Sequence, residues 1–333
     1  MVDLHLHLDG SLSVSEVIRF AQKEGIKLPT YDETSLTAYM KVDEDCTNLG
    51  EYLSKFDFPL MVLQTEEAIE EAVYGLLGRL DKQGLVYAEI RFAPQLHLQK
   101  GLTQNEVVKA AVRGLDRANK DFEIKGNLIL CCMRFDNNEA ENLETVKVAS
   151  EYFGKGVVAI DLAGNEAAFP TDTFKDVFDY AKSEGVTAII HAGEAAGAES
   201  VKQALELGAK RIGHGVHSVE DEEVVNSLCD GKIPLELCYT SNLQTMAVND
   251  KSNYPLSFFV NSGIVVTINT DDMTVSDTNL KKEYLLLKKQ FGYDNEYLKK
   301  ICINGINSAF ISDEMKKGLR EKVLENFEVW INS

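Results

Sequence analysis

The sequence lacks a long hydrophobic run and has few basic residues for its size. No stretch approaches the roughly 20 apolar residues that a membrane-spanning helix needs, and the first residues lack a secretory-signal pattern. The 34 basic residues are outnumbered by 53 acidic ones, which gives a formal net charge of −19. Because such a surface repels phosphate backbones and anionic membranes, we expect neither nucleic acid nor a membrane as a partner.

Cysteine is scarce as well, and the six cysteines show no CxxC spacing. Several lie within apolar runs, which predicts buried free thiols and a cytoplasmic protein. The rest of the composition is typical of a globular protein: of 333 residues, 44% are hydrophobic, 26% are charged and only six are proline. Length and composition fit one domain over residues 1–333, and they leave the oligomeric state open.

Short apolar or β-branched runs alternate with helical patterns along most of the chain. The predicted strands are the opening residues, 86–92, 127–133, 157–162, 187–190, 211–214, 233–238 and 264–270. Apolar strands separated by helices indicate a parallel sheet covered by helices. Eight βα units favour an α/β fold closed into a (β/α)₈ TIM barrel. An open doubly wound sheet is the alternative, but no GxGxxG pattern follows the first strand.

Two segments fall outside this alternation. Residues 29–62 are irregular and polar, which predicts an insertion of short helices after the first strand. Residues 278–330 carry further helical patterns, and we expect them to form a carboxyl-terminal extension packed on the barrel.

The opening strand carries two histidines, His5 and His7. Side chains at i and i+2 of a strand point to the same face. The imidazoles therefore lie side by side at the strand's carboxyl end, which the turn-forming pair Asp9 and Gly10 terminates. Taken alone, the pair fits half of a metal site and two histidines on a half-buried strand equally well.

Further polar residues fall at the carboxyl ends of predicted strands, where barrel enzymes collect their functional groups. Four of the six histidines occupy such ends. The complete set is His5, His7, His191, Glu194, His214, Asp271 and Asp272. Nitrogen and carboxylate ligands without cysteine favour zinc. The fourth predicted strand has no lysine at its tip to bridge two metals, so we expect one ion on His5, His7, His191 and Asp271.

In combination, these motifs resemble those of the adenosine deaminase family of the amidohydrolase barrels. The resemblance runs in matching order from the first residues to about residue 310. It is carried by HLHLDG from His5, DLAG from Asp161, HAGE from His191, GHG from Gly213 and TDD from Thr270. EIRFAP from Glu89 and TSN from Thr240 also match.

The resemblance implies zinc-dependent hydrolytic deamination of adenosine, and of 2′-deoxyadenosine, to inosine or deoxyinosine and ammonia. It places one Zn²⁺ on His5, His7, His191 and Asp271. It also counts Asp271 among the catalytic residues and His7 among those that meet the substrate.

The remaining roles follow from the same resemblance. Glu194 would protonate the purine N1, and His214 would take a proton from the attacking water. Asp272 would face N7, the Gly164 backbone N–H would face N3, and Asp9 would reach the ribose hydroxyls. An aromatic C6 is a poor electrophile until N1 is protonated, so the pKa of Glu194 must be raised, which burial beneath the purine would do.

Other functions use a similar site. An adenine deaminase or a deaminase of N6-modified purine nucleotides would share the metal and the chemistry. Asp9 favours the nucleoside, because adenine-specific relatives frequently carry glutamate there. A mononuclear amidohydrolase that cleaves a cyclic amide is a more distant alternative. Another alternative is a protein that binds zinc without catalysing a reaction. Such a protein would not need Glu194 or His214, and both are present.

Several neighbouring residues are given supporting roles. An apolar cluster in the insertion is either core packing or, as the resemblance implies, a gate over the purine: Phe56, Phe58, Leu60 and Met61. Asp161 is expected to orient a ligand or a loop, Asn242 to stabilise a loop, and His97 to be structural or to support a ligand from behind. Tyr239 and Met273 stand where the family often has proline, which puts local loop shape and purine affinity in question.

Overall fold

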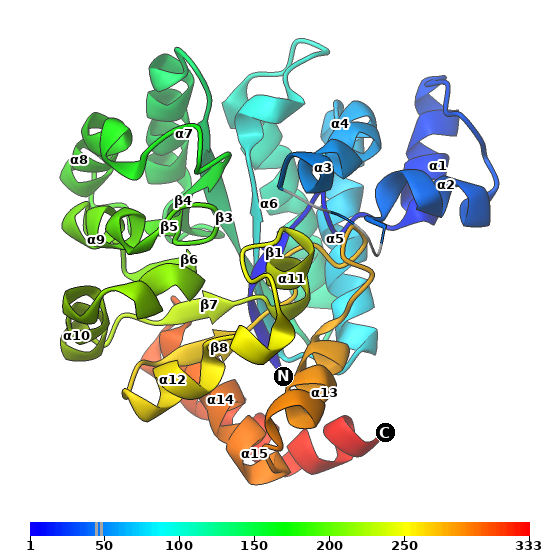
Figure 1. Ribbon diagram of the computed structural model, residues 1–333. Coiled ribbons are helices and arrows are strands. Elements are labelled where there is room, and N and C mark those ends of the chain that lie inside the picture. The colour runs from blue at the N-terminus through cyan, green and yellow to red at the C-terminus, as the bar shows by residue number, and fades with distance from the viewer. Residues whose placement is uncertain (44–45, 47–48) are drawn as a thin grey trace.

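The computed structural model describes all residues except 44, 45, 47 and 48, and it contains the eight expected strands. Each strand is followed by helical segments, which ring the strands in Figure 1. The strands are β1 (Val2–His7), β2 (Tyr87–Phe92), β3 (Lys125–Arg134), β4 (Val157–Gly164), β5 (Ile189–Ala192), β6 (Arg211–His214), β7 (Leu235–Leu237) and β8 (Val266–Ile268). Their positions match the sequence pattern, with ends displaced by a few residues.

Parallel pairing joins β1 to β4 in one run and β5 to β8 in a second. Two further parallel bridges connect these runs, one from β4 to the residue before β5 and one from Leu6 of β1 to Asp271 after β8. At the second bridge, His7 N–H donates to Asp271 O at 2.8 Å and Asp271 N–H donates to His5 O at 2.8 Å. The strands thus close into the predicted (β/α)₈ barrel.

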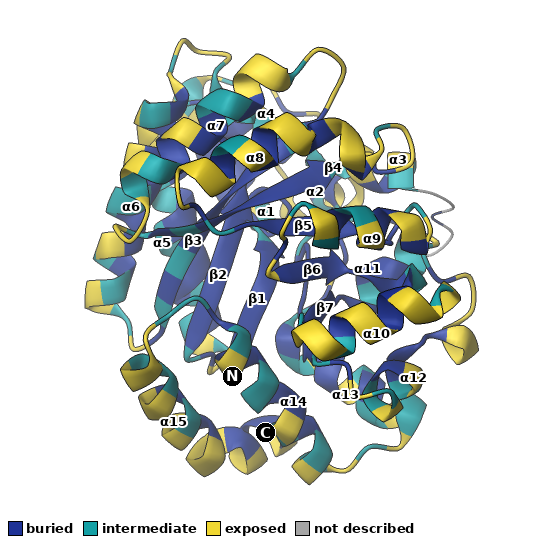
Figure 2. Ribbon diagram, turned by 90° about the vertical axis from the view of Figure 1, so that its left-hand side faces the viewer, coloured by how far each residue is buried: buried dark blue, intermediate teal, exposed yellow. Residues whose placement is uncertain are grey.

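Amphipathic helices cover the outside of the barrel, with buried inner faces and exposed outer faces (Figure 2). They are α1 (Val14–Glu24), α5 (Glu66–Lys82), α6 (Gln104–Asp121), α7 (Glu139–Tyr152), α8 (Lys175–Ser183), α9 (Ala198–Glu206), α10 (Glu222–Gly231) and α12 (Leu256–Asn261). Local signals set their ends. Ser13 and Glu16 form a capping box at the start of α1, and Gly25 ends that helix with a φ of 65°.

The insertion and the extension are helical, as predicted. The insertion contains α2 (Glu33–Met40), α3 (Leu49–Leu53), η1 (Ser54–Phe56) and α4 (Asp57–Val62), while four of its residues lie outside the described ones. The extension contains α13 (Leu280–Phe291), α14 (Asn295–Ser308) and α15 (Asp313–Asn332). α14 packs on β1 and β8 near their amino-terminal ends. Among the described helices, none has both the length and the apolarity to cross a bilayer.

Short helical turns follow several strands and shape the loops at the carboxyl end of the barrel. They are η2 (Pro94–His97), η3 (Thr171–Phe174), η4 (Val216–Glu220), α11 (Tyr239–Gln244) and η5 (Lys251–Asn253). His97 is fully buried, and its Nδ1 lies 2.8 Å from the carbonyl oxygen of Leu63. It therefore has the structural role that the sequence suggested.

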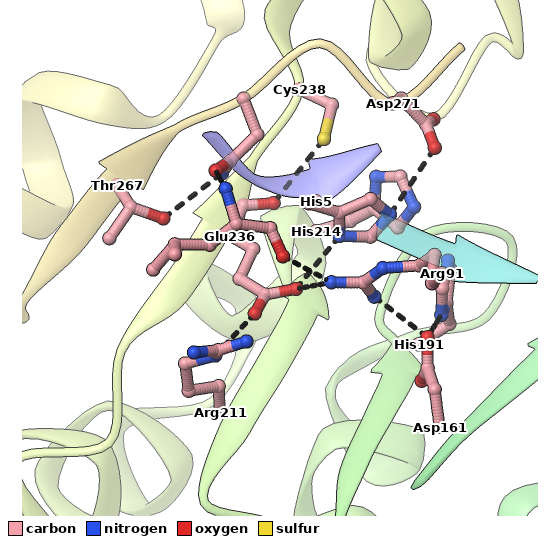
Figure 3. Close-up of polar contacts among 12 residues, drawn as sticks. His5, Arg91, Asp161, His191, Arg211, His214, Glu236, Cys238, Thr267 and Asp271 are labelled. Carbon is pink, nitrogen blue, oxygen red and sulfur yellow. Dashed lines mark hydrogen bonds and ion pairs between the residues drawn. The ribbon is translucent and has the colours of Figure 1, made fainter. Parts of the chain in front are cut away.

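A network of buried charged side chains crosses the inside of the barrel (Figure 3). Glu236 of β7 accepts hydrogen bonds from Arg91 Nη2 at 2.8 Å and from Arg211 Nε at 2.6 Å. Arg211 also donates to Glu89 at 2.5 Å, and Arg91 Nη1 donates to Asp161 at 2.7 Å. None of these five side chains is more than 1% exposed. Buried charges are tolerated only when they are paired in this way.

Replacing Arg211 with methionine tests the importance of this network. The change leaves Glu236 and Glu89 buried with one partner fewer, so we expect the free energy of unfolding in urea to fall by about 3–5 kcal/mol. Arg113→Met is the matched control, because the ion pairs of Arg113 lie at the surface. That control should cost about 0–1 kcal/mol. Equal losses of unfolding free energy in the two variants would show that the buried ion pairs contribute no more to stability than surface ones.

Candidate active site

Four side chains from β1, β5 and the segment after β8 meet at the carboxyl end of the barrel. His7 Nε2 lies 3.3 Å from His191 Nε2. Asp271 Oδ1 lies 3.2 Å from His5 Nε2 and 3.4 Å from His7 Nε2. One ligand atom from each of the four residues lies within 4.8 Å of all the others. The structure therefore brings the four predicted metal ligands together.

The chemistry of this donor set suits a divalent cation. His5 Nε2 is buried and has no hydrogen-bond partner among the described residues. Burial lowers the pKa of His7 and of His191, which keeps both imidazoles neutral and their lone pairs available. Burial alone would raise the pKa of Asp271, but the adjacent histidines, His5 first, hold it well below its ordinary value. Three nitrogens and one carboxylate are a common ligand set for zinc.

A buried carboxylate lies beside the other nitrogen of two of these rings. His5 Nδ1 lies 2.8 Å from Glu236 Oε2, and His191 Nδ1 lies 2.9 Å from Asp161 Oδ2. Both carboxylates belong to the charged network described above, as Figure 3 shows. Such partners fix the orientation of a ligating imidazole, so Nε2 of each ring is aimed at the common centre. Asp161 was expected from the sequence to orient a ligand, whereas Glu236 and Arg91 were not identified.

Two non-glycine residues of the site have left-handed backbone conformations. The φ angle is 60° at Asp271 and 59° at His214. Such conformations are uncommon and concentrate at functional sites. Gly215 follows with a φ of 69°, and a Cβ there would lie 2.6 Å from Leu235 Cδ2. A glycine is thus required beside His214 by both conformation and space.

Glu194 and His214 are the two groups placed to move protons. His214 Nε2 lies 3.6 Å from Glu194 Oε2. The Asn242 amide lies 2.9 Å from His214 Nδ1 and receives a hydrogen bond from the hydroxyl of Tyr254 at 3.0 Å, which fixes the ring. Burial, followed by the charges of Asp271 and Glu166, raises the pKa of Glu194 to about 8. Its carboxyl group is therefore mostly protonated at neutral pH, while burial lowers the pKa of His214 well below its usual value.

A cavity of about 430 Å³ opens above these groups, within the range of roughly 300–1,000 Å³ that small-molecule sites occupy. His5 is fully buried, whereas the other predicted site residues line the cavity: His7, Asp9, Gly164, His191, Glu194, His214, Asp271 and Asp272. Its apolar walls include Leu53, Phe56, Leu60, Leu96, Met133, Phe135 and Phe169. All nine predicted site residues thus lie in or directly beneath one cavity.

The helical insertion contributes to this cavity. Phe56 and Leu60 line it, whereas Phe58 packs on the core and Met61 is 39% exposed. Phe58 therefore has the core role, the gate role of Phe56 and Leu60 stays a prediction, and Met61 fits neither role. Tyr52, which the sequence did not single out, also lines the cavity.

Tyr52 connects the insertion to the polar floor of the cavity. Its hydroxyl donates to Asp272 Oδ2 at 2.9 Å and lies 2.7 Å from Ser276 Oγ. Asp272 Oδ1 is buried and has no hydrogen-bond partner among the described residues. Burial, followed by the charges of Asp271 and Asp9, raises the pKa of Asp272 well above its ordinary value. A protonated Asp272 carboxyl could donate a hydrogen bond to a ring nitrogen.

The two departures from the family pattern lie outside the cavity wall. Tyr239 packs edge-to-face on Tyr254, with ring centroids 4.8 Å apart. Met273 is buried, and its N–H donates to Ser11 Oγ at 3.1 Å. Neither side chain lines the cavity, so neither residue would change purine affinity through direct contact with the ring.

Arg134 is the one Arg or Lys side chain among the described residues that line the cavity, and the sequence did not identify it. Its guanidinium donates to the carbonyl oxygens of Phe169 and His191, each at 2.7 Å, and to Thr171 Oγ1 at 3.0 Å. These bonds direct the guanidinium toward the loop after β4 and toward β5. Arg134 therefore braces the site and is poorly available to a ligand.

Comparison with known proteins agrees with this architecture. The family model described as adenosine deaminase matches residues 1–326. An adenosine deaminase of Haemophilus ducreyi is 50% identical, over 98% of this chain and 96% of its own. The crystal structure of an adenine deaminase from Arthrobacter aurescens has a TM-score of 0.88 and 28% identity, covering 100% and 99% of the two chains.

A second solved structure shares the fold. It is an amidohydrolase from Burkhoderia ambifaria with bound Zn, which has a TM-score of 0.89 and 22% identity and covers 99% of this chain and 91% of its own. The match of the family model over nearly the whole sequence, together with a relative of 50% identity, assigns the family. The chain belongs to the adenosine deaminase family of metal-dependent amidohydrolases.

Proposed function

We propose that this protein is a zinc-dependent adenosine deaminase that converts adenosine and 2′-deoxyadenosine to inosine or deoxyinosine and ammonia. One observation carries the proposal. A carboxyl group, Glu194, and an imidazole, His214, stand 3.6 Å apart beside a three-histidine, one-carboxylate cluster in a largely apolar cavity. An acid, a base and a metal site in one largely apolar cavity suit hydrolysis of an aromatic C–N bond.

One Zn²⁺ per chain would be held by His5, His7, His191 and Asp271. When bound there, zinc supplies a Lewis acid that lowers the pKa of water from 15.7 toward about 7. The neutral state of His7 and His191 and the charged state of Asp271 support this assignment. The carboxylates behind His5 and His191 would hold the rings in place during turnover.

The proton transfers would belong to the protein's own side chains. Glu194 gives its proton to N1 of the purine, which makes C6 electrophilic. His214 takes a proton from the attacking water as the new C6–O bond forms. The C6–N6 bond breaks once N6 has gained a proton, and ammonia leaves. The proton that N6 gains comes from His214. The proton of the C6 hydroxyl passes to Glu194 as the C6=O bond forms, and the 6-oxo product keeps the proton on N1, so both side chains return to their starting states.

The cavity would orient the purine by its edge atoms. Asp272, whose Oδ1 is unpaired, would face N7, and the backbone N–H of Gly164 would face N3. Asp9 would reach the ribose hydroxyls. The apolar walls from Phe56, Leu60 and their neighbours would lie against the ring and exclude water. Exclusion of water also strengthens the electrostatic effects that act on the reacting atoms.

The polarity of the cavity favours a nucleoside over a nucleotide. The hydrogen bonds of Arg134 already go to the loop after β4 and to His191 of β5, and the protein has a net charge of −19. A phosphate group would therefore find no ready cationic partner among the described cavity residues. Buried free thiols such as Cys131 and Cys132 suit a reducing compartment, so we also place the enzyme in the cytoplasm.

A substrate comparison tests the proposed activity. Purified, zinc-loaded protein should deaminate adenosine and 2′-deoxyadenosine, with the reaction followed by loss of adenosine absorbance. We expect kcat/KM for AMP to be lower than that for adenosine by a factor of about 100 or more, since its phosphate would be desolvated without a partner. Adenine should also be poor, because it lacks the ribose that Asp9 would contact. A preference for adenine or AMP would replace the proposed substrate with that of another deaminase.

Replacing Glu194 with glutamine tests the role of the acid. Glutamine keeps the shape of the side chain but cannot give up a proton, so kcat should fall by about 10²–10⁴-fold. The zinc content should stay equal to that of the unmodified protein. Glu199→Gln, an exposed position on α9, is the control and should leave kcat unchanged. Full activity of the Glu194→Gln variant would remove Glu194 from the mechanism.

A further inference from the structure

The short loop that carries Glu194 is held by a carboxylate from a neighbouring loop. Glu166, in the turn after β4, is 3% exposed and lies under residues 193–196. Its Oε1 accepts the N–H of Gly193 at 2.7 Å. Its Oε2 accepts the N–H groups of Glu194 at 3.0 Å, Ala195 at 2.7 Å and Ala196 at 3.1 Å.

The backbone of this loop forms an anion-binding concavity. Four consecutive N–H groups point to one side, and Gly193 begins the run with a φ of 68°. Successive N–H groups in such a turn create a nest that binds a negative charge. Here the charge is supplied internally by Glu166, whose carboxylate also accepts a hydrogen bond from Ser200 Oγ at 2.5 Å. Hydrogen bonds to an ionised acceptor are stronger than neutral ones, so the loop conformation is firmly set.

Further contacts brace the opposite end of the same segment. Ser200 Oγ lies 2.8 Å from Thr171 Oγ1, which receives a hydrogen bond from Arg134. Arg134 also donates to the carbonyl oxygen of His191. The stretch from the predicted metal ligand to the end of the Glu194 loop is therefore clamped at both ends. Glu166 itself does not line the cavity, so any effect on substrate must pass through the loop.

We propose that Glu166 is a positioning residue for the deamination proposed above. By binding four backbone N–H groups, it fixes the loop so that the Glu194 carboxyl points into the cavity beside His214. The inference rests on the proposed function for its kinetic consequence. The holding of the loop itself follows from the hydrogen bonds alone.

Glu166→Gln is the most direct variant, because it preserves the side-chain shape and replaces one acceptor oxygen with an NH₂ group. That group cannot accept the N–H groups it faces, so the loop loses part of its anchor. Ser200→Ala is the matched variant, since it removes one donor to Glu166 and leaves all four N–H bonds in place. It should change kcat less than threefold, whereas a loss equal to that of Glu166→Gln would count against the proposal.

In the zinc-loaded protein, Glu166→Gln should lower kcat for adenosine by about 10–100-fold, as a misplacement near 1 Å can do. KM should change less than about threefold, and zinc content should be unchanged. Affinity for 1-deazaadenosine, which has carbon in place of N1, should also be unchanged. A merely structural defect would instead weaken zinc binding, 1-deazaadenosine binding and turnover together.

A double-mutant cycle isolates the route through Glu194. If Glu166 acts by placing that carboxyl, Glu166→Gln should lower the residual kcat of the Glu194→Gln variant by less than about threefold. If the double variant instead loses kcat by the product of the two single-variant factors, the two residues act independently and the proposal is overturned. So would a kcat for Glu166→Gln within twofold of the unmodified protein.

Hydrogen exchange provides a readout that does not depend on turnover. Amide exchange in the peptide that contains residues 193–196 should become about tenfold faster in Glu166→Gln and stay slow in Ser200→Ala. Unchanged exchange in Glu166→Gln would contradict the anchoring role even if adenosine were not the substrate. An unmodified protein that fails to deaminate adenosine would instead refute the proposed function, and the exchange result would still decide whether Glu166 holds the loop.

Discussion

The pairing of Asp271 with β1 is the contact on which both the fold and the site depend. Its backbone exchanges hydrogen bonds of 2.8 Å with His5 and His7, which closes the last strand of the barrel onto the first. The same residue turns its carboxylate toward the nitrogens of those two histidines. Pairing with β1 and directing the carboxylate toward the histidines together require a left-handed φ of 60° at Asp271, which costs conformational energy locally. Barrel closure and assembly of the metal ligands are therefore one structural event.

Beneath that contact, charged side chains replace the apolar filling that a barrel interior usually has. Arg91 and Arg211 are paired with Glu236, Glu89 and Asp161, and two of these carboxylates lie beside the rings of His5 and His191. Apolar side chains of similar size would be as stable or more so in many proteins. The position of the charges directly behind the ligands suggests that orientation of the metal site, rather than stability, explains their presence.

Much of this arrangement could be predicted from sequence. The alternation of apolar strands and amphipathic helices predicted the barrel, and the polar residues at strand ends predicted which side chains would meet. Local patterns could not show which distant groups support them. Glu166 and Tyr52 act through contacts with residues 193–196 and with Asp272, and nothing in their own neighbourhoods indicates those partners. Arg91 and Glu236 had a weak signal, since each is a charged residue inside a fully buried strand of mostly apolar residues.

The central claim is that His5, His7, His191 and Asp271 hold one zinc ion. Metal analysis combined with X-ray absorption at the zinc edge tests it most directly. We predict one zinc per chain, with nitrogen and oxygen neighbours at about 2.0–2.2 Å and no sulfur. A second group, of His214, Cys238 and Asp271, also lies close enough to bind a cation. A sulfur neighbour at about 2.3 Å would place the ion there and contradict the assignment.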